Sequence, residues 1–344
     1  MHNPLKWLPA IGLLWASCKE AVKEVKAPKL YTAAALRENT SVGAAAFNKD
    51  ETAVMIIDNS TGIFNVYEVN VSDSGKKALT HSAKESYYAV DYLRGTDDFL
   101  YMHDQGGDEN AHIYLQRAGD TTVRDLTPWP GSTNGFYEWN KTKTGFYFTS
   151  NKRNPKFFDL WSMDTSTWKP AMVYQNDSAY DIGAISHTGR YCALVKSITT
   201  DKNELYLYDN QAKKLLPISK GEDANWAPQV FSMNDSILYL TTNKDAEFSY
   251  LTAYDIAAGS LTKEFEDNWD VVGMDLSETG KYRRIFVNDD GKNKLLLFDN
   301  ASGRQVDFPA IPDGDIQDMI ISPSEKNCIL TIGSSRSPSN IYVY

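Results

Sequence analysis

The sequence is poor in the residues and segments from which several kinds of site are built. Only three cysteines occur in 344 residues, and no Cys-x-x-Cys pair is present, which excludes a zinc knuckle and a dithiol redox motif. The apolar run at residues 7–16 is too short to span a bilayer. Basic residues number 35 against 45 acidic ones, a net charge of −10. Such a surface repels polyanions, so we predict no nucleic-acid partner, and no motif indicates a cofactor.

The residues that are present favour a globular, all-β protein. Hydrophobic residues make up 42% of the chain and charged residues 23%, which is the balance of a folded domain. The 20 Tyr, 14 Phe and 8 Trp lie in short runs without helical spacing. Aromatic residues in short runs are typical of strands.

The N-terminus has the layout of an export signal. Lys6 precedes the apolar run, and Leu14-Trp15-Ala16-Ser17 leads into Cys18. This segment resembles a bacterial lipoprotein signal, which implies removal of residues 1–17, lipidation of Cys18 and a periplasmic or outer-membrane location in a bacterium, with the lipid anchor as the only membrane contact. An ordinary signal peptide with an incidental cysteine is the alternative. Residues 18–40 are expected to form a tether with one short helix at 31–37, capped by Thr32.

The most informative feature is an internal repeat. Seven junctions pair an apolar residue with a turn residue, and successive turn residues lie 46, 46, 46, 46, 45 and 45 positions apart. The seven turn residues are Asn48, Arg94, Asn140, Ser186, Ser232, Ser277 and Ser322. A fixed period of about 45 residues is the signature of a repeat architecture.

Each repeat holds short strands, which predicts a seven-bladed β-propeller over residues 41–344. The second strands include 53–57, 99–102, 146–149, 191–195 and 328–332, and the third strands include 65–67, 112–114, 205–208 and 341–344. Short fourth strands are predicted at 78–80 and 125–127. Four strands in about 45 residues match a propeller blade, whose first strand lines a central channel. Cys192 and Cys328 lie six residues past their junctions, in blades that do not touch, so we predict core thiols and no disulfide.

Several segments resemble the N-terminal propeller of the prolyl oligopeptidase family of serine peptidases, in its dipeptidyl and acylaminoacyl peptidase branches. The segments that carry the resemblance are 39–47 (NTSVGAAAF), 60–67 (STGIFNVY), 104–110 (DQGGDEN), 150–153 (SNKR) and 158–161 (FDLW). In that family the propeller precedes an α/β-hydrolase domain and restricts access to its active site to peptides. The resemblance therefore implies a domain that binds or gates peptides.

The catalytic signature of such a peptidase is missing from these 344 residues. No Gly-x-Ser-x-Gly elbow occurs, and the last histidine is His187, so a Ser, Asp and His triad in that chain order is not available. We expect a non-catalytic chain of a truncated or split peptidase, with a separate α/β-hydrolase domain as a possible partner. A stand-alone periplasmic propeller that binds protein, and a hydrolase acting at the channel mouth, are the alternatives.

Candidate binding residues lie at the start of the channel-lining strands. Tyr88, Tyr180 and Trp226 each precede their junction by six residues, and Trp269 is nearby. Such rings could form a funnel for peptide side chains, and packing between blades is the alternative. Asp270 and Asp315 precede their junctions by seven residues, which would place two carboxylates near one opening, either as a glycosidase-like pair or as solvated loop acids.

The loop at 104–110 and the two histidines beside it can be interpreted either as structural features or as metal ligands. Residues 104–110 could form a calcium loop, but their spacing differs from an EF-hand, and a turn is favoured. His103 and His112 flank this loop without further ligands at metal-binding spacing, so we predict no metal site and hydrogen-bonded histidines.

The last repeat has no fourth strand after 341–344, which would leave an open strand edge. Residues 29–33 could fold back to cover it. The alternative, which we favour, is an open edge through which the protein associates with another chain.

Overall fold

The computed structural model describes residues 27–219, 221–308 and 310–344. The chain divides into two compact units, one ending at Asn39 and one running from Thr40 to Tyr344. The first contains the helix α1 (Ala33–Arg37), which Thr32 caps by accepting the N–H of Ala35 at 3.1 Å. No helix in the described residues has the length and hydrophobicity needed to cross a bilayer. The predicted signal peptide and Cys18 lie outside the described residues.

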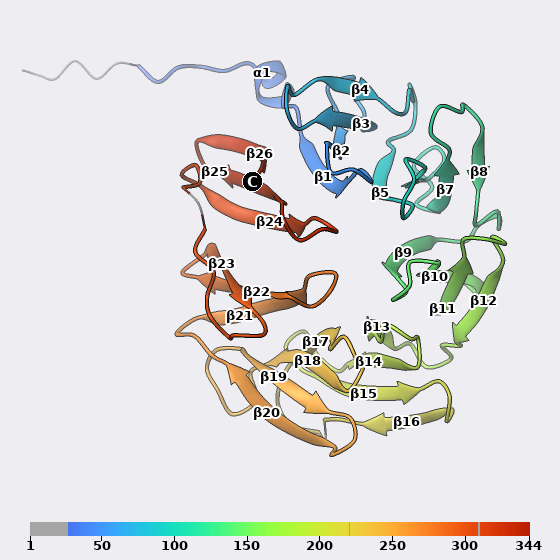
Figure 1. Ribbon diagram of the computed structural model, residues 1–344, viewed down its shortest axis with the longest axis vertical. Helices are drawn as coiled ribbons and strands as arrows, with labels where there is room; N and C mark the ends of the chain where they lie inside the picture. Colours follow the sequence, from blue (N-terminus) through green and yellow to red (C-terminus); the bar gives the residue numbers. More distant parts are fainter. Residues whose placement is uncertain (1–26, 220, 309) are drawn as a thin grey trace, which may run out of the picture. The chain divides into compact units, whose positions relative to one another are not determined.

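The second unit is a seven-bladed β-propeller of antiparallel sheets around one channel (Figure 1). The innermost strands are β1 (Val42–Phe47), β5 (Tyr88–Tyr92), β9 (Asn134–Trp139), β13 (Asp181–Ile185), β17 (Trp226–Phe231), β21 (Asp270–Leu276) and β24 (Asp315–Ile321). The second strands are β2 (Ala53–Asp58), β6 (Phe99–His103), β10 (Gly145–Asn154), β14 (Tyr191–Ser197), β18 (Ile237–Thr242), β22 (Tyr282–Asp289) and β25 (Cys328–Ser334).

The outer strands complete five of the seven blades. The third strands are β3 (Asn65–Asn70), β7 (His112–Gln116), β11 (Phe157–Asp164), β15 (Asn203–Asp209), β19 (Tyr250–Asp255), β23 (Lys292–Asp299) and β26 (Ser337–Val343). The fourth strands of blades one to five are β4 (Lys76–Ala78), β8 (Val123–Asp125), β12 (Pro170–Tyr174), β16 (Lys214–Pro217) and β20 (Ser260–Phe265). In the described residues, blades six and seven have three-stranded sheets. In blade six, an isolated β-bridge between Phe298 and Gln305 lies where the other blades have a fourth strand.

The seven junctions are tight turns, and the repeat of Ser and Asn there has a physical cause. The side chain at this position accepts a backbone N–H from the start of the second strand. Ser186 Oγ accepts from Tyr191 N at 2.9 Å, and Ser277 Oγ accepts from Tyr282 N at 2.8 Å. Gly189 completes one turn with a φ of +72°, and a Cβ there would lie 2.4 Å from the hydroxyl of Tyr147. Small capping residues and glycine therefore keep the period in register.

Every inner strand carries one β-bulge, which the sequence did not indicate. The bulged residues are Ala45, Val90, Tyr137, Gly183, Gln229, Val272 and Gln317. A bulge increases local twist and turns side chains out of the sheet's regular alternation. All seven bulges thus lie in the strands nearest the propeller axis.

The hydrophobic core consists of clusters between neighbouring blades. Cys192 is fully buried in the cluster between blades three and four, whereas Cys328 is half-buried in blade seven. Both thiols are free, as predicted.

The predicted extent of two fourth strands was wrong by two residues. The strands end at Ala78 and Asp125, before Leu79-Thr80 and Leu126-Thr127. The leucines pack between blades, and the threonine hydroxyls bond to the third strand instead of continuing the ladder.

Candidate functional site

The predicted aromatic residues lie at the end of the channel where the inner strands begin, which we call the strand-start opening. Trp226 is only 1% exposed and belongs to the core between blades four and five. Trp269 is half-buried and packs on Phe248, with ring centroids 5.7 Å apart. Both rings thus pack within the blades, and the buried ring of Trp226 is not available to stack on a ligand.

Tyr180 and Tyr88 differ in how tightly their surroundings hold them and in how exposed their rings are. Tyr180 packs edge-on against Tyr206 at 5.4 Å, and its backbone N–H and C=O bond to the side-chain amide of Asn176. Tyr88 is 46% exposed and touches Phe64. Within the described residues no ring contact joins Tyr88, Tyr180 and Trp226 to one another. The structure therefore does not assemble the predicted three-ring funnel, and Tyr88 alone remains well exposed.

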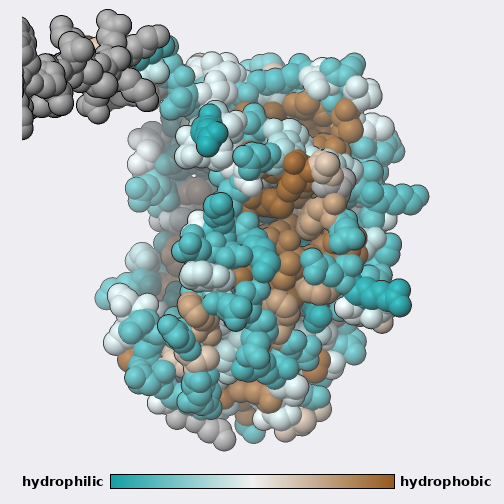
Figure 2. Space-filling view, turned by 90° about the vertical axis from the view of Figure 1, so that its left-hand side faces the viewer, coloured by the Kyte–Doolittle hydropathy of each residue, from teal (hydrophilic) through white to brown (hydrophobic). Residues whose placement is uncertain are grey.

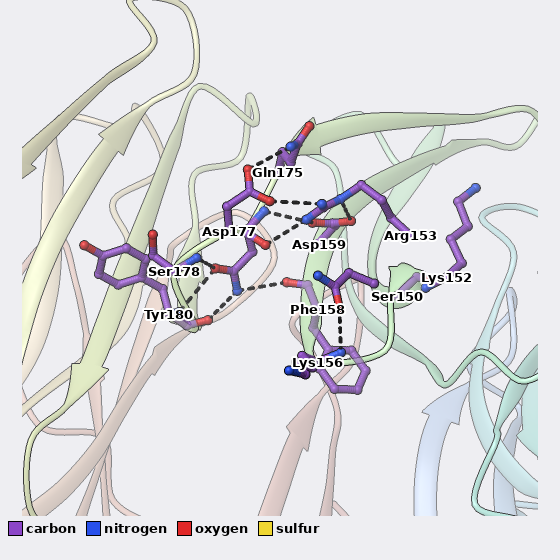
Figure 3. A network of polar contacts seen from close by, with 12 residues as sticks. Ser150, Lys152, Arg153, Lys156, Phe158, Asp159, Gln175, Asp177, Ser178 and Tyr180 are labelled. Carbon is purple, nitrogen blue, oxygen red and sulfur yellow. Dashed lines mark hydrogen bonds and ion pairs between the residues drawn. The ribbon is translucent and has the colours of Figure 1, made fainter.

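Figure 3 shows the polar network that holds Tyr180. Asp159, which is fully buried, accepts two hydrogen bonds from Arg153, both at 2.8 Å, and a third from Asn176 N at 2.8 Å. Arg153 also pairs with the exposed Asp177 at 2.9 Å. Because a buried carboxylate needs a partner, this bidentate pair fixes the segment that leads from blade three to Tyr180.

Asp270 and Asp315 tie neighbouring blades together. Asp270 accepts the backbone N–H of Ser249 at 2.8 Å, and Asp315 accepts the N–H and side-chain amide of Asn293 at 2.6 and 3.1 Å. Each carboxylate thus bonds to the preceding blade. This arrangement favours neither a glycosidase pair nor free loop acids.

At the opposite end of the channel, formed by the junction turns, contacts join blades that are not neighbours. Glu278 of blade six pairs with Arg94 of blade two and, at 3.6 Å, with Lys143 of blade three. Lys141 of blade three donates to the carbonyl of Met233 in blade five at 2.8 Å. We call these contacts the cross-channel bridge. In the described residues, such contacts between distant blades occur only at this junction-turn end.

Around the bridge, several junction turns also bond to the turn of a neighbouring blade. Glu51 accepts from Ser324 and Asn327, which links blades one and seven. Asp235 accepts the backbone N–H groups of His187 and Thr188, which links blades five and four. Burial acts to raise the pKa of Asp235, but hydrogen bonds from the side chains of His187 and Thr188, together with those from their backbone N–H groups, outweigh burial and lower it to about 2. Hydrogen bonds thus join the turns of blades one and seven and of blades four and five.

Two channel carboxyl groups near the bridge have raised pKa values. Loss of hydration raises the pKa of Asp91 to about 6, although the indole of Trp139 donates to it at 2.7 Å. Loss of hydration, together with the neighbouring Asp275, raises the pKa of Glu138 to about 7. Within the described part of the chain, Glu138 Oε1 has no hydrogen-bond partner. These groups can hold or release a proton near neutral pH, so the charge of this end of the channel varies with pH.

A cavity of about 340 Å³ lies beside the bridge. Asp91, Arg94, Trp139, Lys143 and Glu278 are among its lining residues. The bridge therefore forms one wall of a cavity of mixed polar and apolar lining at the junction-turn end of the channel.

The loop at 104–110 is a turn that uses its own carboxylates. Asp104 accepts the N–H of Glu109 at 3.0 Å, and Asp108 accepts from Asn110 at 3.0 and 3.1 Å. His103 is stacked between Tyr87 and Tyr114, and His112 bonds to Asp125 at 2.7 Å. In the described residues, no group of three or more acidic, His or Cys side chains could hold a metal ion.

Sequence reasoning missed the residues of the cross-channel bridge. Arg94 is itself a junction residue, while Glu278 and Lys141 directly follow theirs and Lys143 lies three positions after Asn140. Charged residues at these repeat positions were a signal that could have been used. The pairing of Arg94 with a residue 184 positions away was not predictable from the period.

Comparison with known proteins agrees with this architecture. The family model of the prolyl oligopeptidase N-terminal β-propeller domain matches residues 39–344. Dipeptidyl aminopeptidase BIII of Pseudoxanthomonas mexicana is 24% identical over 291 residues, which are 82% of this chain and 42% of the relative. The chain thus spans less than half the length of that relative.

Solved structures of low identity share the fold. A prolyl endopeptidase superposes with a TM-score of 0.63 at 13% identity, over 89% of this chain and 48% of that one. An oligogalacturonate lyase in complex with manganese gives 0.67 at 11% identity, over 88% and 90% of the two chains. The oligogalacturonate lyase of Vibrio parahaemolyticus gives 0.62 at 9% identity, over 87% and 88%.

Proposed function

Because the chain belongs to the family of prolyl oligopeptidase N-terminal β-propeller domains, we propose that it is the non-catalytic, peptide-admitting propeller of a peptidase of that type. The peptidase chemistry then belongs to an α/β-hydrolase domain outside residues 39–344. The absence of a Gly-x-Ser-x-Gly elbow from the sequence supports the assignment of catalysis to a domain other than this propeller.

The observation that carries the proposal is the cross-channel bridge. It joins distant blades across the junction-turn end, while the strand-start opening has no contact between distant blades in the described residues. The channel is therefore a chamber that peptides enter at the strand-start opening. Glu278 pairs with two of the three cations of the bridge, Arg94 and Lys143, and the Arg94 side chain is 55% exposed. Exposed ion pairs contribute little stability, so such a bridge can open and close.

Peptide binding to wild-type protein and to Glu278→Gln tests this role. The probe is a pool of fluorescein-labelled hexapeptides, followed by anisotropy and by stopped flow. Loss of the Glu278 charge frees Arg94 and Lys143 and adds a second route at the junction-turn end, so association and dissociation should both accelerate with little change in affinity. The matched control is Glu264→Gln, which removes an ion pair between the neighbouring blades five and six. No peptide binding, or equal kinetics in both variants, would contradict the proposal.

A fluorophosphonate probe tests the absence of catalysis. We expect no labelled serine in this chain and no cleavage of chromogenic dipeptide substrates. Labelling of any serine would overturn the non-catalytic assignment.

Export is a separate part of the proposal. The segment before Cys18 resembles a lipoprotein signal, so radiolabelled palmitate should enter the wild-type protein in a bacterial host and not Cys18→Ser. Equal labelling of the two proteins, or none in either, would refute lipidation at Cys18.

A further inference from the structure

Several lysines of the propeller pair with a carboxylate at the surface. Figure 2 shows that hydrophilic side chains dominate the side of blades six and seven, around a narrower hydrophobic band. Lys294 of blade six pairs with Asp267 at 3.0 Å, and Lys263 of blade five pairs with Glu266 at 2.8 Å. Such pairs compensate the charge of the lysine within the protein.

Lys152 has no such partner. It lies on β10 at the rim of the strand-start opening, two residues beyond Ser150, which pairs with the first residue of the inner strand β9. Within the described residues, the Lys152 ammonium forms no hydrogen bond and no ion pair. Figure 3 shows its side chain pointing away from Asp159, whose carboxylate is bound by Arg153.

Two tryptophans between blades two and three hold this ammonium. The Lys152 Nζ atom lies 3.4 Å from the ring centroid of Trp129 and 3.8 Å from that of Trp161. Cation–π attraction fixes the ammonium in place but brings no negative charge. Loss of hydration lowers the pKa of Lys152, so the protonated form is less stable here than in water. The indole N–H of Trp161 is also buried without an acceptor in the described part of the chain. A negatively charged acceptor would therefore stabilise this site.

Blade five repeats the local structure around Lys152. Lys244 is its equivalent, since each lysine lies 12 residues after the junction residue of its blade. The backbone N–H of each lysine donates to the hydroxyl two positions before it, at 3.2 Å in both blades. The asparagine before each lysine accepts an N–H from the segment that enters the blade, at 2.7 Å from Thr133 and 2.8 Å from Asn225. The two sites can therefore be compared residue by residue.

The site in blade five includes a carboxylate, and the site in blade three does not. Lys244 pairs with Glu222 at 3.1 Å. Glu222 lies three residues after Ser219, and the inner strand begins seven residues after that serine. After blade two, Thr127 has the place of Ser219, and Pro130 has the place of Glu222. The entering segment 128–133 contains no acidic residue. Blade three thus keeps the lysine of this pair without the acid.

We propose that Lys152, held by Trp129 and Trp161, binds the carboxylate of a peptide ligand in the position that Glu222 has in blade five. The carboxylate is the C-terminus of the peptide or one of its acidic side chains. This inference rests on the proposed admission of peptides, because the rim between blades two and three belongs to the opening that they would enter. The ammonium donates a charge-assisted hydrogen bond to the carboxylate. Because the net charge of −10 disfavours acidic ligands elsewhere, this cation determines where the carboxylate binds.

Three unlabelled peptides test the role of the ligand carboxylate by titration calorimetry, in which no dye adds charge. The first is an N-acetylated hexapeptide of alternating serine and alanine with a free C-terminus. The second is its C-terminal amide, and the third is the same amide with one serine replaced by glutamate. We expect one of the two acidic peptides to bind about tenfold more tightly than the neutral amide, and its identity distinguishes the two sources of the carboxylate. High salt should reduce this preference.

Four protein variants locate the bound carboxylate. Lys152→Met keeps the apolar stem on the tryptophans and removes the charge, so it should bind all three peptides equally. Lys156→Met, at an exposed lysine of the same hairpin, should keep the preference. Pro130→Glu supplies the acid that blade five has, and it should abolish the preference without a change to the lysine. Pro130→Gln, at the same exposed position, should keep it.

The outcomes separate this inference from the proposed function. Equal affinity of the wild type for acidic and neutral peptides would overturn the inference and leave peptide binding intact. Absence of binding by all three peptides would refute both. A preference that survives in Lys152→Met or in Pro130→Glu would also overturn the inference, because the carboxylate would then bind elsewhere.

Discussion

Leu126 and Thr127 directly follow the fourth strand of blade two, and replacing each of them tests whether this pair holds blades two and three together. Thr127 is fully buried, and its hydroxyl accepts the N–H of the equally buried Ile113 at 2.9 Å. Thr127→Val keeps the shape and leaves that N–H without a partner, which typically lowers the free energy of unfolding by about 1–3 kcal/mol. Leu126→Ala removes most of a side chain that is 5% exposed between blades two and three. This change should lower the free energy of unfolding by about 2–5 kcal/mol.

Urea unfolding followed by tryptophan fluorescence measures both effects. The midpoint should fall while the dependence on urea stays constant, since the same surface is exposed on unfolding. Thr121→Val, at an exposed threonine in the same hairpin, is the matched control and should change stability by less than about 0.5 kcal/mol. Ser219→Ala should resemble Thr127→Val, because the bond to Leu205 has nearly the same length. Losses below about 0.5 kcal/mol for Thr127→Val and Ser219→Ala would refute the role assigned to the hydroxyl.

Three further predictions concern titratable groups. The pKa of Glu138 is raised, so the contribution of this group to stability is present below pH 4.5 and is lost as pH rises through about 7. In urea titrations, Glu138→Gln should therefore gain stability relative to wild type as pH rises from 4.5 to about 7. The lowered pKa of Asp235 gives the opposite sign: Asp235→Asn should be less stable than wild type above pH 3.8, with a difference that shrinks as pH falls toward about 2. Burial raises the pKa of the Cys192 thiol to about 12, so a thiol reagent at pH 8 should label this residue only after urea is added, and rapid labelling of the native protein would contradict the packing described.

The repeat period predicted the architecture because the capping residues that create it are local. Ser186 and Ser277 bond within their own turns, so their chemistry is visible in a few residues of sequence. The same period left two positions open for Trp226, since a residue at the start of an inner strand can face either the channel or a neighbouring blade. Its 1% exposure depends on how blades four and five pack, and this is a property of the ring.

The candidate site was less predictable than the fold because its contacts cross the ring. Arg94 and Glu278 are 184 residues apart, and their pairing needs the positions of blades two and six. Asp315 was singled out as a channel acid, but its bonds to Asn293 depend on the loop of the preceding blade. The ends of the fourth strands were misjudged for a similar reason, since Leu126 leaves the ladder to reach blade three.

The most direct test of the central claim is to locate a peptide inside the channel. Val272 is the bulged residue of β21 and is 49% exposed, so Val272→Cys in a Cys18→Ser, Cys328→Ser background can carry a bimane label. Val123→Cys on β8 carries the same label on the outer surface. We expect tryptophan-containing hexapeptides to quench the label at position 272 in a saturable manner and to leave the label at position 123 unchanged. Equal quenching at both positions, or none at position 272, would contradict a peptide-admitting channel.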